Sequence, residues 1–78
     1  MKTVREEAII QLVQQRLNQN KLTSGETIYV TFQNGDVLLV GWCDYEEQKI
    51  AAERIVSGTY GVVRVVSQLK IRRLKQSI

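Results

Sequence analysis

The first apolar residues of the chain recur at the spacing of an α-helix. Between about Thr3 and Asn18, good helix-forming residues separate apolar positions that share one broad face at 3.6 residues per turn. These positions are Ala8, Ile9, Ile10, Leu12, Val13 and Leu17. A polar segment with one glycine, from Asn18 to Glu26, then predicts a loop.

The pattern next changes to the two-residue period of β-strands. Residues 28–32, Ile-Tyr-Val-Thr-Phe, alternate and are rich in β-branched and aromatic side chains. Asn34-Gly35 follows, and this pair favours the type I′ turn of a hairpin because both residues tolerate positive φ. Residues 37–43 are apolar on both faces of the returning strand. We therefore expect this strand to be central in a sheet, or to meet a partner on one face.

A second helix and a third strand complete the pattern. Asp44 is predicted to be the N-cap of a helix that runs to about Ser57, with Glu47 completing a capping box. Gly58 and Gly61 bracket the predicted end of this helix, where a glycine commonly adopts a left-handed conformation. The strand predicted over residues 62–72 alternates in two sets: Val65, Ser67, Leu69 and Ile71, and Val66, Gln68, Lys70 and Arg72.

The order αββαβ predicts an α+β fold. A two-layer sandwich suits these elements, with a three-stranded mixed sheet and both helices on one face. The connection through the second helix is long enough for a right-handed parallel crossover, which explains the mixed sheet. We expect one domain over residues 1–72 and a short basic C-terminal tail over residues 73–78.

One face of the predicted sheet is left without a helix to cover it. If Val37, Leu39 and Gly41 face the helices, the alternate residues of the hairpin form an apolar patch of the kind that marks interaction surfaces. The predicted interface residues are Tyr29, Leu38, Val40, Trp42 and Val66. We expect self-association through this face, or through an edge strand that joins two sheets. The opposite register of the second strand would instead bury Trp42.

Charge and composition narrow the function classes. The 78 residues have a net charge of +3, no histidine and one cysteine, so the commonest general base and metal ligand is missing. We expect no enzyme activity, no metal, no cofactor and no small-molecule substrate. The sequence shows no signal peptide or membrane-spanning run, which favours a cytoplasmic location, with a peripheral place at a membrane surface as the alternative. Candidate anion-binding residues gather near the C-terminus: Lys70, Arg72, Arg73 and Lys75.

Two further features have a functional and a structural interpretation. Cys43 precedes a helix N-terminus, which would lower its thiol pKa if the side chain pointed there, whereas a small buried hydrophobic residue is the favoured interpretation. Asp44, Glu46 and Glu47 resemble the carboxylates of an acid–base site, but their place in a first helical turn explains them as capping and dipole partners.

The order and spacing of these elements resemble the BON domain, named for bacterial osmotic-stress and nodulation proteins. The resemblance spans roughly residues 5–72. Its most specific elements are Gly35 in the hairpin, Gly41 near the end of the second strand, and Gly61-Val62 before the third. The resemblance implies an αββαβ fold without catalytic activity that contacts phospholipid membranes or other proteins. Members of the family usually lie in the bacterial envelope, often as paired copies.

The sequence thus predicts a BON-like binding or assembly module. It self-associates through the apolar sheet face and contacts an anionic partner through its basic C-terminal strand. The first alternative is a peripheral phospholipid-binding module, and the second is a small nucleic-acid-binding protein that uses the same basic residues.

Overall fold

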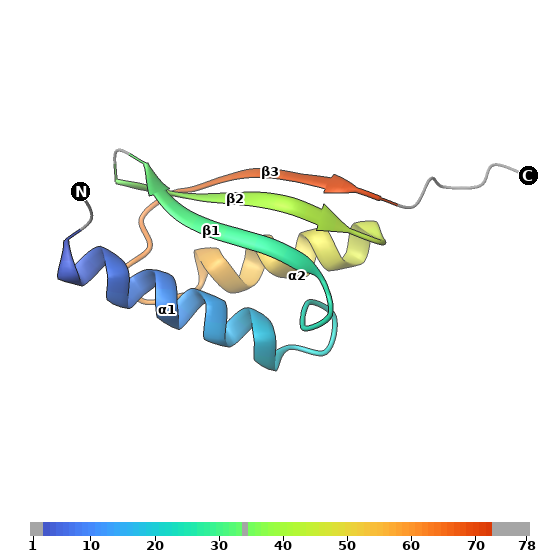
Figure 1. Cartoon of the computed structure of the whole chain (residues 1–78), viewed down its shortest axis with the longest axis horizontal. Helices are drawn as coiled ribbons and strands as arrows, with labels where there is room; N and C mark the ends of the chain where they lie inside the picture. The colour runs from blue at the N-terminus through green and yellow to red at the C-terminus, as the bar shows by residue number, and fades with distance from the viewer. Residues whose placement is uncertain (1–2, 34, 73–78) are drawn as a thin grey trace, which may run out of the picture.

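Two helices pack against one side of a three-stranded sheet in the computed structural model, which describes residues 3–33 and 35–72 (Figure 1). The elements are α1 (Val4–Gln19), β1 (Thr27–Gln33), β2 (Asp36–Cys43), α2 (Glu46–Ser57) and β3 (Val65–Ile71). The strands lie in the order β1-β2-β3, with β1 and β2 antiparallel and β2 and β3 parallel. The predicted α+β two-layer sandwich with a mixed sheet is therefore confirmed.

A capping box fixes the start of α1. The hydroxyl of Thr3 accepts a hydrogen bond from the backbone N–H of Glu6 at 3.1 Å, and the carboxylate of Glu6 accepts one from the backbone N–H of Thr3 at 3.0 Å. Along the helix, Ile9, Val13 and Leu17 recur every four residues and are buried. This narrow stripe holds α1 against the sheet, while Leu12 of the broader predicted arc is 37% exposed.

The core lies between the sheet and the helices. From β2, the residues that face the helices, Val37, Leu39 and Cys43, are fully buried. The helices and the outer strands complete the core with Ile9, Val13, Leu17, Val30, Ala52, Val56 and Leu69. One side of the central strand is therefore committed to the core, and this fixes which residues lie on the opposite face.

The start of α2 differs from the prediction. The N-cap is Tyr45, not Asp44, and the reciprocal contact comes from Gln48, not Glu47. The side-chain oxygen of Gln48 accepts hydrogen bonds from the backbone N–H groups of Asp44 and Tyr45, each at 2.9 Å. Its amide nitrogen donates to Glu26 at 3.0 Å. An amide can accept from the backbone and donate to a carboxylate at once, which a glutamate at this position could not do.

The connection from α2 to β3 also differs in detail. Gly58 is the C-cap but has φ −88°, so it is not left-handed, and the positive φ of 95° belongs to Gly61. β3 begins at Val65, three positions later than predicted, because residues 62–64 form a connection in which Val63 is 91% exposed. Hydrogen bonding to β2 begins one residue before β3, at Arg64, whose carbonyl oxygen accepts a hydrogen bond from the N–H of Val37 at 2.9 Å.

Candidate interaction surface

The sheet face opposite the helices brings together the apolar residues that the sequence singled out. Tyr29 is paired with Val40 across the antiparallel strands, and Leu38 is paired with Val66 across the parallel strands. Paired residues project to the same face of a sheet. We call this surface the open face, and its residues are Thr27, Tyr29, Thr31, Leu38, Val40, Trp42, Val66, Gln68 and Lys70.

The open face exposes large apolar side chains. Tyr29 is 64% exposed, Trp42 45% and Val40 38%. The alternative register, which would bury Trp42, is wrong, because Leu39 and Cys43 occupy the buried side of β2. Among residues 3–33 and 35–72 both helices lie on the other side of the sheet, so no element covers this face (Figure 1). Its role as an interface stays a prediction.

A cation lies over the aromatic centre of the open face. Trp42 is paired with Lys70, and the ammonium nitrogen of Lys70 lies 5.7 Å from the centroid of the Trp42 ring. Such a cation–π contact contributes about 0.5–1 kcal/mol at an exposed site. Trp42 is nevertheless 45% exposed, so part of its ring is still open to a partner.

Ion pairs close the two ends of the apolar patch. At the hairpin end, a guanidinium nitrogen of Arg64 lies 2.8 Å from a carboxylate oxygen of Asp36. At the other end, Nε of Arg72 lies 3.0 Å from Asp44, and Nη2 of the same guanidinium lies 3.3 Å from Glu26. Both ends thus carry charges of both signs.

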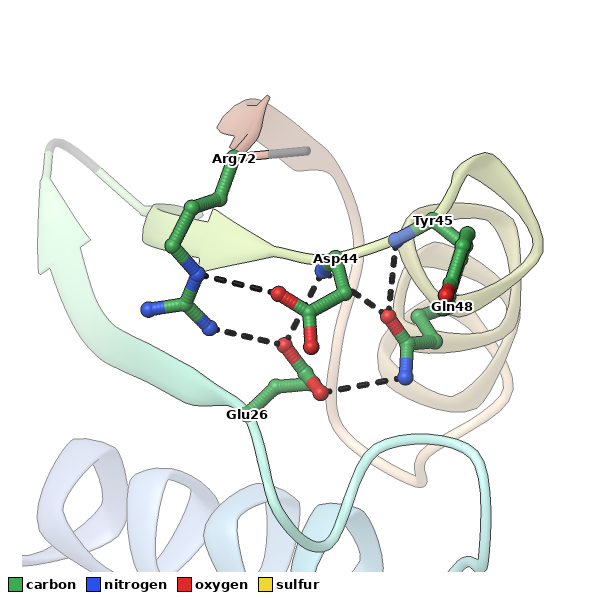
Figure 2. Close-up of polar contacts among 5 residues, drawn as sticks. All are labelled: Glu26, Asp44, Tyr45, Gln48 and Arg72. Atoms are coloured by element: carbon green, nitrogen blue, oxygen red, sulfur yellow. Dashed lines mark hydrogen bonds and ion pairs between the residues drawn. The ribbon is translucent and has the colours of Figure 1, made fainter. Parts of the chain in front are cut away.

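Glu26 organises the second of these ends (Figure 2). Its side chain is only 7% exposed, although it is a carboxylate. One oxygen accepts hydrogen bonds from the backbone N–H of Asp44 at 3.1 Å and from Arg72, and the other accepts from Gln48. This network joins the start of β1, the end of β2, the first turn of α2 and the end of β3.

Comparison with protein families identifies the fold family. The model of the BON domain matches residues 5–73. The chain belongs to the BON domain family. The elements that carried the resemblance, the hairpin glycine, Gly41 and Gly61, all have positive φ, as their places in the turns and close contacts of this BON domain require.

A solved structure shares the fold. The likeness is to CdsD, a structural protein of the type III secretion system of Chlamydia trachomatis, with a TM-score of 0.71 and 15% sequence identity. The match covers 90% of this chain and 33% of that one, so this chain spans about a third of the CdsD structure. A comparison with curated protein sequences found no match.

The structure describes two of the four predicted anion-binding residues of this BON domain, and these two have different partners. Lys70 lies on the open face against Trp42, whereas Arg72 is occupied by the carboxylates of Glu26 and Asp44. Arg73 and Lys75, and the whole predicted tail, lie outside the described residues. The two residues that the structure describes, Lys70 and Arg72, therefore have separate partners.

The other candidate groups have structural roles. Cys43 is fully buried, and burial, reinforced by the nearby carboxylate of Glu26, raises the pKa of its thiol rather than lowering it. Asp44 accepts from Arg72, while Glu46 and Glu47 lie in the first turn of α2. In the described part of the chain, no three His, Cys, Asp or Glu side chains are placed to hold a metal ion, and no helix is long and apolar enough to cross a membrane.

The sequence did not reveal Glu26 or Gln48 as site residues. Glu26 is separated from its partners Asp44, Gln48 and Arg72 by 18, 22 and 46 positions, so no local pattern links them. A local signal for Gln48 was present, since it stands three positions after the true N-cap.

Proposed function

We propose that this BON domain is a non-enzymatic interaction module that self-associates through its open face. The observation that carries the proposal is the exposure of Trp42, Tyr29 and Val40 on one side of a sheet whose other side holds the core. Family membership supports a contact role, because BON domains contact proteins or membranes. The role of CdsD as a structural protein of a secretion system fits the same class of function.

A second copy of the chain suits this face. The apolar centre lies between two ends that each carry acidic and basic groups, so a rotated copy can place unlike charges opposite each other. Two such faces can pack as aligned sheets about 10 Å apart. Burial of about 100 Å² of apolar surface contributes about 2.5 kcal/mol, while association costs at least about 4 kcal/mol. The free energy that a patch of a few hundred Å² contributes is therefore of the same order as this cost. We accordingly expect association that depends on concentration.

Light scattering across a wide concentration range tests the proposal. The variant Trp42→Glu removes the largest apolar side chain, and its carboxylate can pair with Lys70 across the strands, so the fold is retained. Val40→Lys is a second variant at the centre of the patch. We expect the mass of the wild type to grow with concentration, and both variants to reach a lower limiting mass than the wild type with an unchanged circular dichroism spectrum.

Tyr60→Glu is the matched control. Tyr60 is 88% exposed and lies in the connection between α2 and β3, so the same change from an aromatic residue to glutamate falls outside the open face. The control should associate like the wild type. A wild type that is monomeric throughout, or a Tyr60→Glu variant as defective as Trp42→Glu, would contradict the proposal.

An anionic phospholipid surface is the second candidate, favoured by the contact between Trp42 and Lys70 on the open face. Tryptophan is enriched at the headgroup level of membranes, and a lysine near an anionic surface contributes about 1 kcal/mol. Co-sedimentation with vesicles that contain phosphatidylserine, compared with vesicles of phosphatidylcholine alone, tests this candidate. It predicts binding to the anionic vesicles only, with a loss in Lys70→Glu. Equal behaviour with both vesicles rules it out.

A further inference from the structure

The free edge of β3 presents a row of backbone groups. Val37 donates its N–H to the carbonyl of Arg64, and Cys43 accepts from the N–H of Arg72, so alternate residues of β2 bond to the even-numbered residues of β3. The odd-numbered residues, Val65, Ser67, Leu69 and Ile71, therefore direct their N–H and C=O groups away from β2. The backbone of another extended strand is the ligand that matches such a row.

A groove runs beside this edge, between β3 and α2. It has a volume of about 470 Å³ and is lined by Ile50, Glu53, Arg54, Ser57, Val65 and Ser67. The hydroxyl oxygen of Ser67 is buried there without a hydrogen-bond partner among the described residues. Ile50, on the helix side, is 41% exposed. The side chains of a strand added to β3 would have room in this groove.

The flank of α2 beside the groove carries charges of both signs. Glu46 and Glu47 lie in its first turn and Arg54 in its last, and the spacing places them with Ile50 along one side of the helix. Neither Glu53 nor Arg54 has an ion-pair partner in residues 3–33 and 35–72. If two copies meet around a two-fold axis, α2 meets α2 in the opposite direction, and Arg54 of each copy faces the acidic turn of the other.

We propose that β3 pairs antiparallel with β3 of a second copy, which joins two sheets into one of six strands with the α2 helices side by side beneath the new junction. The outward backbone groups are satisfied when odd-numbered residues pair, and a two-fold axis at Gln68, the middle residue of β3, uses all four of them. In this register Ser67 pairs with Leu69 of the other copy, and Gln68 lies opposite itself. This inference rests on the proposed function only in assuming association between copies, and it uses a different surface.

The opposite edge of the sheet is less suited to the same contact. β1 also has outward backbone groups, at Ile28, Val30 and Phe32. However, the hollow beside it is only about 40 Å³ and lies at the start of the strand, between Leu17, Thr23 and Ile28. In the described part of the chain, this hollow is thus much smaller than the groove beside the β3 edge.

The variant Ser67→Pro tests the pairing. The N–H of Ser67 points outward, so proline removes a donor from the free edge without breaking a bond between β2 and β3. We expect Ser67→Pro to halve the limiting mass of the assembly while its circular dichroism spectrum is retained. Arg54→Glu, which sets acid against acid across the axis, should have the same effect, and Arg16→Glu on α1 should have none. An unchanged mass in both Ser67→Pro and Arg54→Glu overturns the inference.

Cysteine cross-linking locates the junction. Tyr29, Val40 and Gln68 form one row across the open face, with Tyr29 on β1 and Gln68 on β3. The Gln68→Cys variant should form a disulfide-linked dimer under mild oxidation, because residues opposite at a two-fold axis come within bridging distance. Tyr29→Cys is the matched control and should not cross-link, and the native Cys43 is buried. Equal cross-linking of both variants, or of neither, contradicts the β3 junction.

The two proposals fail separately in these experiments. Loss of mass in Trp42→Glu but not in Ser67→Pro or Arg54→Glu would retain the open-face contact and overturn the β3 junction. The reverse result, with cross-linking of Gln68→Cys alone, would retain the β3 junction and overturn the open-face contact.

Discussion

Gly41 is a position of the central strand that has no room for a side chain. It has φ 142°, and a side chain at this position would overlap the backbone carbonyl of Thr27 on the neighbouring strand. Backbone atoms of a paired strand cannot move aside as the end of a flexible side chain can. We expect Gly41→Ala to lower the free energy of unfolding by about 3 kcal/mol, from backbone strain and overlap together.

Urea denaturation of Gly41→Ala measures this loss, and Gly25→Ala is its control. Gly25 has no positive φ, and a Cβ there would meet nothing within 4 Å. Its replacement should leave stability within about 0.5 kcal/mol of the wild type. If the two variants lose stability equally, the close approach of β1 to β2 at Gly41 is not the cause.

Cys43 should make the stability of the fold depend on pH in the alkaline range. Burial raises the pKa of its thiol above the ordinary value of 9.0 in the folded chain, while the unfolded chain keeps that value. Above about pH 9 the unfolded state therefore holds fewer protons, and stability falls until the pH passes the folded pKa. The loss in urea midpoint between pH 7.5 and pH 10 should be smaller in Cys43→Val than in the wild type. Equal losses would contradict this assignment.

At the scale of elements, the predictions were accurate where the determining interactions are local in the sequence and wrong where they are distant. α1 and the hairpin were predicted because their signals, the apolar stripe ending at Leu17 and the Asn34-Gly35 pair, lie within a few residues. The predicted start of α2 was wrong by one position. Asp44 is a good N-cap residue, but its carboxylate instead accepts a hydrogen bond from Arg72, which is distant in the sequence. Nothing near Asp44 in the sequence indicates that contact.

The network around Glu26 should stabilise the junction of the elements. Glu26→Ala would leave the part-buried side-chain amide nitrogen of Gln48 without its acceptor and would remove one carboxylate partner of Arg72. The N–H of Asp44 would keep only the oxygen of Gln48 as its acceptor. We expect a loss of about 1–3 kcal/mol in the free energy of unfolding, measured in urea. Glu7→Ala, at an exposed position of α1, should lose about 0.5 kcal/mol or less. A similar small loss in Glu26→Ala would show that water replaces the network.

At the scale of the whole molecule, the sequence indicated which residues form the open face but not the groove beside β3. The alternation of β2 predicted correctly which residues leave the core, because Val37 and Leu39 are buried and Val40 and Trp42 are not. The groove between α2 and β3 depends on how far the helix lies from the sheet edge, which alternation does not encode. The same holds for the hydroxyl of Ser67, whose isolation follows from packing.

Self-association should also couple the stability of the domain to its concentration. Because an assembly binds folded copies and not unfolded chains, mass action raises the unfolding temperature as protein concentration increases. The wild type and Tyr60→Glu should both show a rising midpoint in thermal scans, whereas the midpoint of Trp42→Glu should rise less over the same concentrations. As Trp42 is the chain's single tryptophan, its fluorescence should shift to shorter wavelength over the same concentration range, since association removes its ring from water. A midpoint that rises without any change in this fluorescence would assign the coupling to another surface, with the β3 edge the first to test.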